Sequence, residues 1–269
     1  PGGGLPLQSD PPVTVSGVPA EKLPLWNWMR DKLPDDTLIQ AFPSYPNELV
    51  ERYHMYGQRV HGLPITNGDP QQIGIGSDLT SSTADPRWPG VAADLATVGV
   101  GNVTVIPELY AIVGIDPPDV NAPPDGFEVA KVFPDGNALW RVVAEPRDGL
   151  AFVEIDNWWT PERRGGRNWR FMRDQAVVHV YVPEAGRYRL DVGARSAAGP
   201  RPLVLRAVGE VLQSATVGAE RDLSATVELP AGRTDVTLMN PGYTAQDIPS
   251  GDPRAWSLEV SDITVTRLS

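Results

Sequence analysis

The sequence has no cysteine and only three histidines and three lysines among its 269 residues. The absence of cysteine excludes disulfide frameworks, thiolate metal sites and cysteine nucleophiles. The histidines, His54, His61 and His179, leave little material for a histidine metal cluster. Acidic residues outnumber basic ones by 34 to 23, and the net charge of -11 lacks the basic footprint of a nucleic-acid-binding protein. We therefore expect no nucleic-acid partner.

Long hydrophobic runs are also missing. No stretch approaches the roughly 20 apolar residues that a membrane-spanning helix needs. The sequence opens with neither a methionine nor a signal peptide but with Pro1-Gly2-Gly3-Gly4, a composition typical of a linker or an extended arm. We therefore expect a soluble piece of a larger protein.

Charge and proline are unevenly distributed, and the change falls near residue 145. Residues 1–145 contain 18 acidic and 8 basic side chains and 19 of the 28 prolines, whereas residues 146–269 contain 16 acidic and 15 basic side chains. This shift predicts an arm at residues 1–22, a first domain at residues 23–145 and a second at residues 146–269.

Each predicted domain has its own hydrophobic period. In the first, helical spacing at residues 23–33, 46–61 and 91–98 alternates with short strand-like runs at residues 37–42, 102–107 and 109–113, which predicts a small α/β unit. Later, short alternating runs are separated by turn residues, at residues 138–143, 150–155, 176–182, 188–194, 203–208, 223–229, 235–239 and 256–268. In one of them Tyr188, Leu190 and Val192 are expected to face inward. The predicted fold class is α+β, a small α/β domain followed by an antiparallel jelly-roll-like β-sandwich.

The most distinctive motif is YHMYGQRVHGLPITNG, which runs from Tyr53 to Gly68. It follows a helix containing Trp28 and a strand that ends in Phe42-Pro43. This order resembles the extracytoplasmic tail of bacterial membrane glycosyltransferases of the GT-C type, with Gly57 standing where a larger residue is expected. Residues 99–106 and 127–143 resemble two further strands of such tails. The resemblance covers most of residues 22–145 and, more loosely, the sandwich.

The resemblance implies that the reaction centre lies on loops between transmembrane helices, which this sequence does not contain. It implies that the chain itself is non-catalytic, joins the membrane through those absent segments and lies on the periplasmic or cell-wall side. The implied partner is a glycan or a glycolipid acceptor.

The motif also allows two interpretations from its residues. In the first, His61 lies at the end of a helix, where a positive charge interacts favourably with the helix dipole. Its side chain then caps the helix and fills a domain interface. Alternatively, His61, Gln58, Asn67 and Tyr56 line a polar groove. The first interpretation is favoured.

A second candidate site lies in the sandwich, where tryptophans gather near polar residues. Two adjacent tryptophans in a strand face opposite sides, so one of Trp158 and Trp159 is expected to be exposed. An exposed indole beside amide and guanidinium groups suits sugar recognition. The alternative is that Trp158 and Trp169 are core or interdomain residues and that the nearby arginines pair with the acidic first domain. The candidate ligand-binding residues of this segment are Asn157, Trp158, Trp159, Trp169 and Arg170.

Sandwiches of the carbohydrate-binding type often hold a structural Ca²⁺, and hard oxygen ligands suit this ion. The candidate ligands are Asp262, expected just before the last strand, with Glu154 or Asp156.

Three functions remain open. The first is a non-catalytic extracytoplasmic region that binds or positions a glycan, and the second is a free-standing secreted carbohydrate-binding protein. The third is a glycoside hydrolase that uses scattered carboxylates such as Glu48 and Glu51. Because these two glutamates lie three residues apart on one predicted helix, a solvated helix face is the favoured explanation for them.

Overall fold

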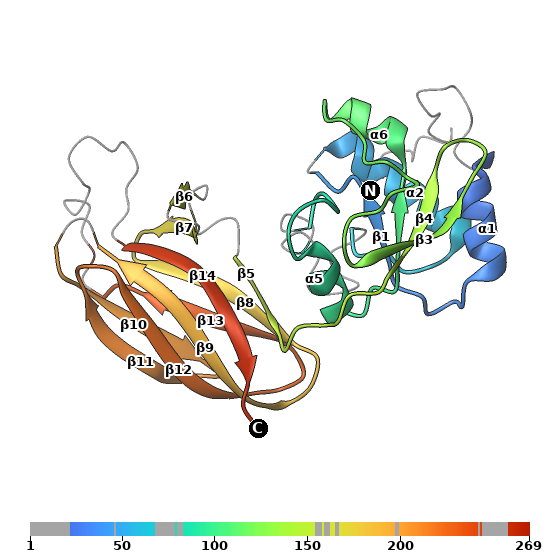
Figure 1. The fold of residues 1–269 in the computed structure, drawn as a ribbon. Coiled ribbons are helices and arrows are strands. Elements are labelled where there is room, and N and C mark those ends of the chain that lie inside the picture. Colours follow the sequence, from blue (N-terminus) through green and yellow to red (C-terminus); the bar gives the residue numbers. More distant parts are fainter. Residues whose placement is uncertain are drawn as a thin grey trace, which may run out of the picture. The chain divides into compact units, whose positions relative to one another are not determined.

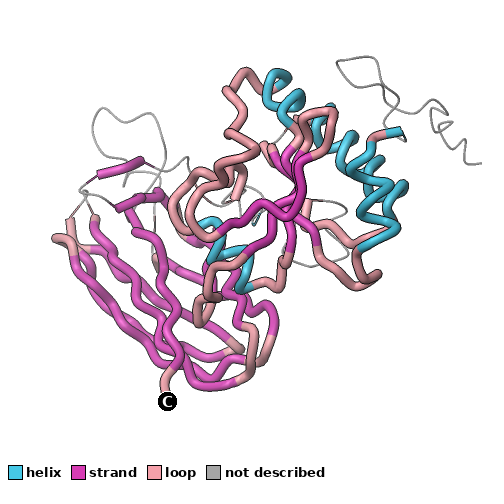
Figure 2. The backbone as a smooth tube through the Cα atoms, turned by 45° about the vertical axis from the view of Figure 1, so that its right-hand side comes forward, coloured by secondary structure: helices cyan, strands magenta, loops and turns pink. Residues whose placement is uncertain are grey.

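The structure is a computed structural model that describes residues 22–45, 47–67, 79, 83–153, 158, 162–164, 167–196, 199–241, 243 and 258–269. The chain folds into two compact units, unit 1 at Pro1–Pro146 and unit 2 at Arg147–Ser269. The described helices all belong to unit 1 (Figure 2). Among the described residues, no helix is both long and apolar enough to cross a membrane. Apart from Lys22, the arm expected at residues 1–22 lies outside the described residues.

Unit 1 is built on a four-stranded mixed sheet with the order β1-β2-β4-β3 (Figure 1). The strands are β1 (Ile39–Phe42), β2 (Asn102–Val105), β3 (Phe127–Val132) and β4 (Ala138–Val142). β1 and β2 are parallel, whereas β4 pairs antiparallel with both β2 and β3. All four residues of β1 are buried, as expected for a strand covered on both faces.

Helices α1 (Pro24–Lys32) and α2 (Glu48–His61) pack on the sheet face that carries Ile39 and Leu139. Asn47 caps α2, because its side-chain oxygen accepts hydrogen bonds from the first turn of the helix. Gly62 ends α2 in the left-handed region, at φ 78°. The predicted helices at residues 23–33 and 46–61 therefore match α1 and α2 closely.

Gly57 lets α1 and α2 approach each other. A Cβ atom at this position would lie 2.6 Å from Cε2 and Cζ2 of the buried Trp26 ring. Trp26 also contacts Tyr53, with ring centroids 5.0 Å apart. The glycine that departed from the family pattern thus makes room for an indole from the neighbouring helix.

The remaining described helices are α5 (Val91–Thr97) and α6 (Pro107–Ile112). The prediction of a strand at residues 109–113 was wrong, because this segment belongs mainly to α6. Pro107 stands in the first turn, where its fixed φ and missing N–H suit a helix start. A run of five apolar residues does not distinguish a strand from a buried helix by its period.

Unit 2 is a sandwich of two five-stranded antiparallel sheets. The first has the order β11-β10-β13-β8-β5 and the second the order β12-β9-β14-β7-β6 (Figure 1). The strands are β5 (Leu150–Val153), β6 (Glu162–Arg164), β7 (Arg167–Met172), β8 (Gln175–Val182), β9 (Gly186–Arg195), β10 (Arg201–Ala207), β11 (Glu210–Val217), β12 (Arg221–Leu229), β13 (Gly232–Met239) and β14 (Leu258–Arg267).

Alternating side chains from both sheets form one hydrophobic core. Tyr188, Leu190 and Val192 are at most 2% exposed, so the inward positions predicted for β9 are confirmed. The predicted fold class, a small α/β domain followed by an antiparallel β-sandwich, is confirmed. One alternating run belongs elsewhere, since residues 138–142 form β4 in the sheet of unit 1.

The contact between Gly57 and Trp26 yields a stability prediction. On helix propensity alone, Gly57→Ala would stabilise α2 by about 1 kcal/mol. Because the added methyl group meets a buried ring, we expect the free energy of unfolding of unit 1 to fall by about 1–3 kcal/mol instead. Urea unfolding followed through amide signals of α2 measures this change.

Gly101→Ala is the matched control. A Cβ atom at Gly101 meets nothing within 4 Å, and its φ is not positive. We expect this substitution to change stability by less than about 0.5 kcal/mol. A Gly57→Ala variant more stable than the wild type would contradict the role assigned to the Trp26 contact.

Candidate functional site

One end of the sandwich gathers the ends of strands from both sheets. In the first sheet, β13 ends where β8 begins, because Met239 pairs with Gln175. In the second sheet, β9 ends where β14 begins, because Arg195 pairs with Glu259. A hydrogen bond from Ser196 N to Gly218 O joins the turns that cross between the two sheets. We call this end, which includes Asn240 directly after β13, the Asn240 end. β5 also ends near it, since Val153 pairs with Val178.

The side chain of Trp158 binds β8 just past the point where β5 ends. In the register of β5 and β8, Val153 pairs with Val178, so Val177 is the next residue of β8 past the end of β5. The indole Nε1 of Trp158 donates a hydrogen bond to Val177 O at 2.9 Å. Trp158 is half-buried and packs against the hydrophobic core of the sandwich. The indole is therefore held in place while part of its surface stays accessible.

Asn240 is the functional candidate that the sequence did not indicate. Its backbone is well paired, since Asn240 N donates to Asp174 O at 2.7 Å and Asn240 O accepts from Tyr243 N at 3.2 Å. Its side chain is different: the residue is 2% exposed, yet neither Nδ2 nor Oδ1 has a hydrogen-bond partner among the described residues. Buried amides are nearly always paired, and leaving one unpaired costs about 1–3 kcal/mol.

Asn240 and Trp158 lie at the same end of one sheet. Asn240 follows Met239, which pairs with Gln175, whereas Trp158 binds Val177 two residues further along β8. Because β13 and β5 flank β8 on opposite sides, the unpaired amide and the half-buried indole lie at the same end of the sheet, on either side of β8.

Trp169 is a core residue, which corrects its placement in an accessible ligand site. It is 3% exposed, and its ring contacts the guanidinium of Arg195 at 5.3 Å from the ring centroid. Arg195 also binds Glu259, with Nη2 and Oε2 2.8 Å apart. A ring enclosed in this way has no free face for a sugar. The half-buried Arg170 on the same strand makes contacts of its own and is not a free cation.

Several candidate residues lie outside the described part of the chain, namely Glu154, Asp156, Asn157 and Trp159. The backbone of Asp262 is described, but its side chain is not. Asp262 lies inside β14 rather than before it, at a register shift between Val260 and Ile263. At this bulge the hydroxyl of Ser261 accepts a hydrogen bond from Gly193 N at 2.8 Å.

The proposed calcium ligands therefore stay a prediction. Among the described residues, no group of three or more His, Cys, Asp or Glu side chains is placed to hold a metal ion.

In unit 1, His61 and Asn67 serve the fold instead of lining a groove. His61 is 5% exposed, and its Nδ1 accepts a hydrogen bond from Leu63 N at 3.0 Å. Burial lowers the pKa of His61 to about 4, so the expectation of a charged histidine at the helix end is wrong. The amide of Asn67 pairs with both backbone groups of Ala41, donating at 2.9 Å and accepting at 3.3 Å.

Gln58 and Tyr56 lie on α2 and are both half-buried. Each makes interactions, and Tyr56 contacts the ring of Trp26 at 6.4 Å between centroids. Glu48 and Glu51 are exposed, and Glu48 forms an ion pair with Arg52 one helical turn away. The solvated helix face favoured for the two glutamates agrees with this arrangement.

Comparison with known proteins gives matches only among solved structures. No family model matches the chain, and no curated protein matches it either. A GH26-CBM35 β-(1,4)-mannanase from Podospora anserina is 14% identical, with a TM-score of 0.33, over 46% of this chain and 28% of that chain. The chain thus spans less than a third of this mannanase.

Two isolated modules are also similar in structure. A family 35 carbohydrate-binding module from Clostridium thermocellum is 15% identical over 44% of this chain and 92% of its own, with a TM-score of 0.30. A carbohydrate-binding module from Cellvibrio mixtus lichenase 5A, solved with cellotriose, is 16% identical over 44% of this chain and 88% of its own, with a TM-score of 0.28.

The buried histidines of unit 1 make its stability depend on pH. Burial lowers the pKa of both His54 and His61 to about 4, below the ordinary value of 6.5. The folded chain therefore keeps them neutral, while the unfolded chain takes up protons as the pH falls from 6.5 towards 4. We expect stability to be complete above pH 6.5 and to fall by up to about 3 kcal/mol per histidine at pH 4.

Urea unfolding across this pH range, followed through amide signals of α2, measures the loss. His61→Gln should reduce the slope of stability against pH, because one of the two titrating groups is removed. The prediction fails if the slope is the same in the wild type and in His61→Gln.

Proposed function

We propose that the Asn240 end of the sandwich binds a glycan, with Asn240 and Trp158 as contact residues. The observation that carries this proposal is the side chain of Asn240, which is buried with both amide atoms unpaired among the described residues. An amide offers two donor hydrogens and an acceptor oxygen. A sugar hydroxyl both donates and accepts, so adjacent hydroxyl groups of a glycan match this amide.

Trp158 supplies the apolar part of the same site. Its hydrogen bond to Val177 O fixes the indole before any ligand arrives, so little side-chain entropy is lost on binding. A flat aromatic ring offers its face to the C–H groups of a pyranose. An amide for the hydroxyl groups and an indole for the ring face are complementary parts of a sugar site.

The proposal includes the setting of the chain. We propose that it is a non-catalytic extracytoplasmic region of a membrane glycosyltransferase-like protein, and that it binds or positions a glycan or glycolipid acceptor. The resemblance of Tyr53–Gly68 and the strands around it supports this setting. The sequence encoded upstream tests it, since several transmembrane helices there would support a membrane protein and a secretory signal peptide alone would favour a secreted carbohydrate-binding protein.

Asn240→Leu is the sharpest test of the glycan site. Leucine has nearly the same shape, and removing an unpaired amide from a buried position should leave the free energy of unfolding unchanged or raise it by about 1 kcal/mol. Glycan binding should weaken at least tenfold because the hydrogen bonds to the hydroxyl groups are lost. An array of bacterial and plant oligosaccharides selects the ligand, and titration calorimetry with that ligand measures the change.

Gln213→Leu is the matched control. Its Oε1 atom on β11 is also buried without a partner among the described residues, but Gln213 pairs with Leu205 of β10, and β10 separates it from β13 and Asn240. We expect Gln213→Leu to bind the selected glycan as the wild type does. Undiminished binding in Asn240→Leu, or failure of the wild type to bind any glycan on the array, would refute the proposal.

A further inference from the structure

Three segments of unit 1 meet beyond the carboxyl ends of the parallel strands β1 and β2. The segment after β1 is joined to the loop before α5, because Ser44 donates from N to Ala84 O at 3.1 Å and from Oγ to Thr83 O at 3.2 Å. The third segment is α6, which follows β2. In open α/β sheets, ligands bind outside the carboxyl ends of the strands. This edge of the sheet therefore has the right location for a binding site.

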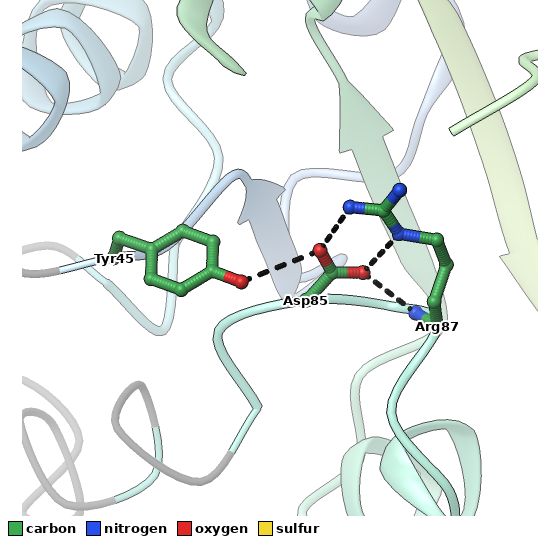
Figure 3. Close-up of polar contacts among 3 residues, drawn as sticks. All are labelled: Tyr45, Asp85 and Arg87. Carbon is green, nitrogen blue, oxygen red and sulfur yellow. Dashed lines mark hydrogen bonds and ion pairs between the residues drawn. The ribbon is translucent and has the colours of Figure 1, made fainter. Parts of the chain in front are cut away.

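Asp85 and Arg87 form the centre of this edge (Figure 3). The Asp85 side chain is 2% exposed. Its Oδ1 accepts from Arg87 N at 2.9 Å and from Nε at 2.8 Å, while Oδ2 accepts from Nη2 at 2.5 Å. Burial by itself would raise the pKa of Asp85, but the hydrogen bonds and charge of Arg87 lower it below its ordinary value. A charged, buried carboxylate thus fixes one edge of the guanidinium.

The opposite edge of Arg87 is available. The side chain is 38% exposed, and Nη1 makes no hydrogen bond to a described residue; in Figure 3 this nitrogen points away from Asp85. One face of the guanidinium lies over the ring of Tyr110, 5.8 Å from its centroid. A guanidinium held on one edge and one face can still donate a pair of hydrogen bonds from its free edge. Such a fork fits the two oxygens of a carboxylate or phosphate.

Tyr45 and Trp88 form an aromatic pair next to Asp85. Trp88, the next residue, is 41% exposed, and its ring meets that of Tyr45 edge-on, 5.9 Å between centroids at 88°. Tyr45 in turn donates a hydrogen bond to Oδ2 of Asp85 at 3.4 Å. Exposed indole surface therefore lies against Tyr45, which shares the Asp85 carboxylate with Arg87.

Tyr110 provides a second, independent indication of a missing partner. The residue is fully buried, and its hydroxyl has no hydrogen-bond partner among the described residues. Burial and the charge of Asp85 raise its pKa, so the hydroxyl keeps its proton and is a donor. A buried donor without a described partner is thus carried by the residue whose ring lies against the guanidinium of Arg87.

We propose that Arg87, Trp88 and Tyr45 form a binding site for an anionic sugar. Its carboxylate or phosphate accepts two hydrogen bonds from the free edge of Arg87, and its ring lies against the indole of Trp88. Asp85 acts as the positioning residue that sets the orientation of Arg87. This site is independent of the glycan site proposed in the sandwich, because none of its residues belongs to unit 2.

Titration calorimetry of the full chain tests the site with four probes: glucuronate, glucose 1-phosphate, inorganic phosphate and glucose. We expect one of the two anionic sugars to bind with a dissociation constant in the millimolar range or below, and more tightly than inorganic phosphate or glucose. Binding of glucuronate would identify a carboxylate ligand, and binding of glucose 1-phosphate a phosphate ligand. No binding of either sugar, or equal binding of glucose or of inorganic phosphate, would overturn the proposal.

Variants locate the binding on the molecule. Arg87→Gln should weaken binding at least tenfold, while Arg30→Gln should not change it. Arg30 is the matched control because it also pairs with a neighbouring aspartate in unit 1, with Nε and Oδ1 of Asp31 3.0 Å apart. Since Arg87→Gln removes the positive charge that pairs with the buried Asp85 and can destabilise unit 1, Trp88→Ala is the second variant. Its side chain is largely exposed, so the fold should persist while binding weakens; unchanged binding in Trp88→Ala would also refute the site.

Discussion

Buried polar groups need hydrogen-bond partners, and this requirement shapes both units. A buried donor or acceptor left unpaired costs about 1–3 kcal/mol, a large fraction of the stability of a domain. In unit 1 the amide of Asn67 pairs with the backbone of Ala41, and Asp85 receives donors from Arg87 and Tyr45. In unit 2 Glu259 is buried against Arg195. Among the described residues with an unpaired buried side-chain atom, Asn240 stands out because both polar atoms of its amide lack a partner.

The two proposed sites follow from the same constraint in opposite ways. At the Asn240 end a buried group lacks a partner among the described residues, and the proposal supplies one. At the edge of β1 and β2 the buried carboxylate of Asp85 is fully partnered, and this leaves its arginine oriented with one edge free. Each proposed site also includes a tryptophan with accessible surface, Trp158 in unit 2 and Trp88 in unit 1. A candidate site is therefore indicated either by a buried polar group without a hydrogen-bond partner or by a buried charged group that orients an exposed side chain.

The elements that could be predicted from the sequence are long and bury only one face, so their apolar residues recur with a clear period. Tyr188, Leu190 and Val192 alternate clearly because β9 has one face in the core, and α2 shows its spacing over 14 residues. β11 was missed because it is an edge strand in which most side chains are half-buried or exposed, so its apolar residues do not alternate. Residues 109–113 were misassigned because a short apolar run has the same composition in a strand and in a helix.

The sites were harder to predict than the fold, since each depends on contacts between residues far apart in the sequence. Trp169 has the composition of a sugar-binding residue, and only the contact with Arg195 shows that its ring is enclosed. Asn240 stands before Pro241, a pair typical of an ordinary turn, and only its burial without a described partner singles it out. Asp85 and Arg87 are two residues apart, but their relation to Tyr45 and Tyr110 requires the sheet to bring β1 and α6 together.

The position of β14 constrains how the sandwich assembles. Although β14 comes later in the chain than every other described strand of unit 2, it lies in the middle of its sheet, between β9 and β7. Until β14 pairs, the facing edges of β9 and β7 are open. Open edges of this kind can pair with other chains. Unit 2 is therefore complete only when β14 joins the β9–β12 pair to the β6–β7 hairpin.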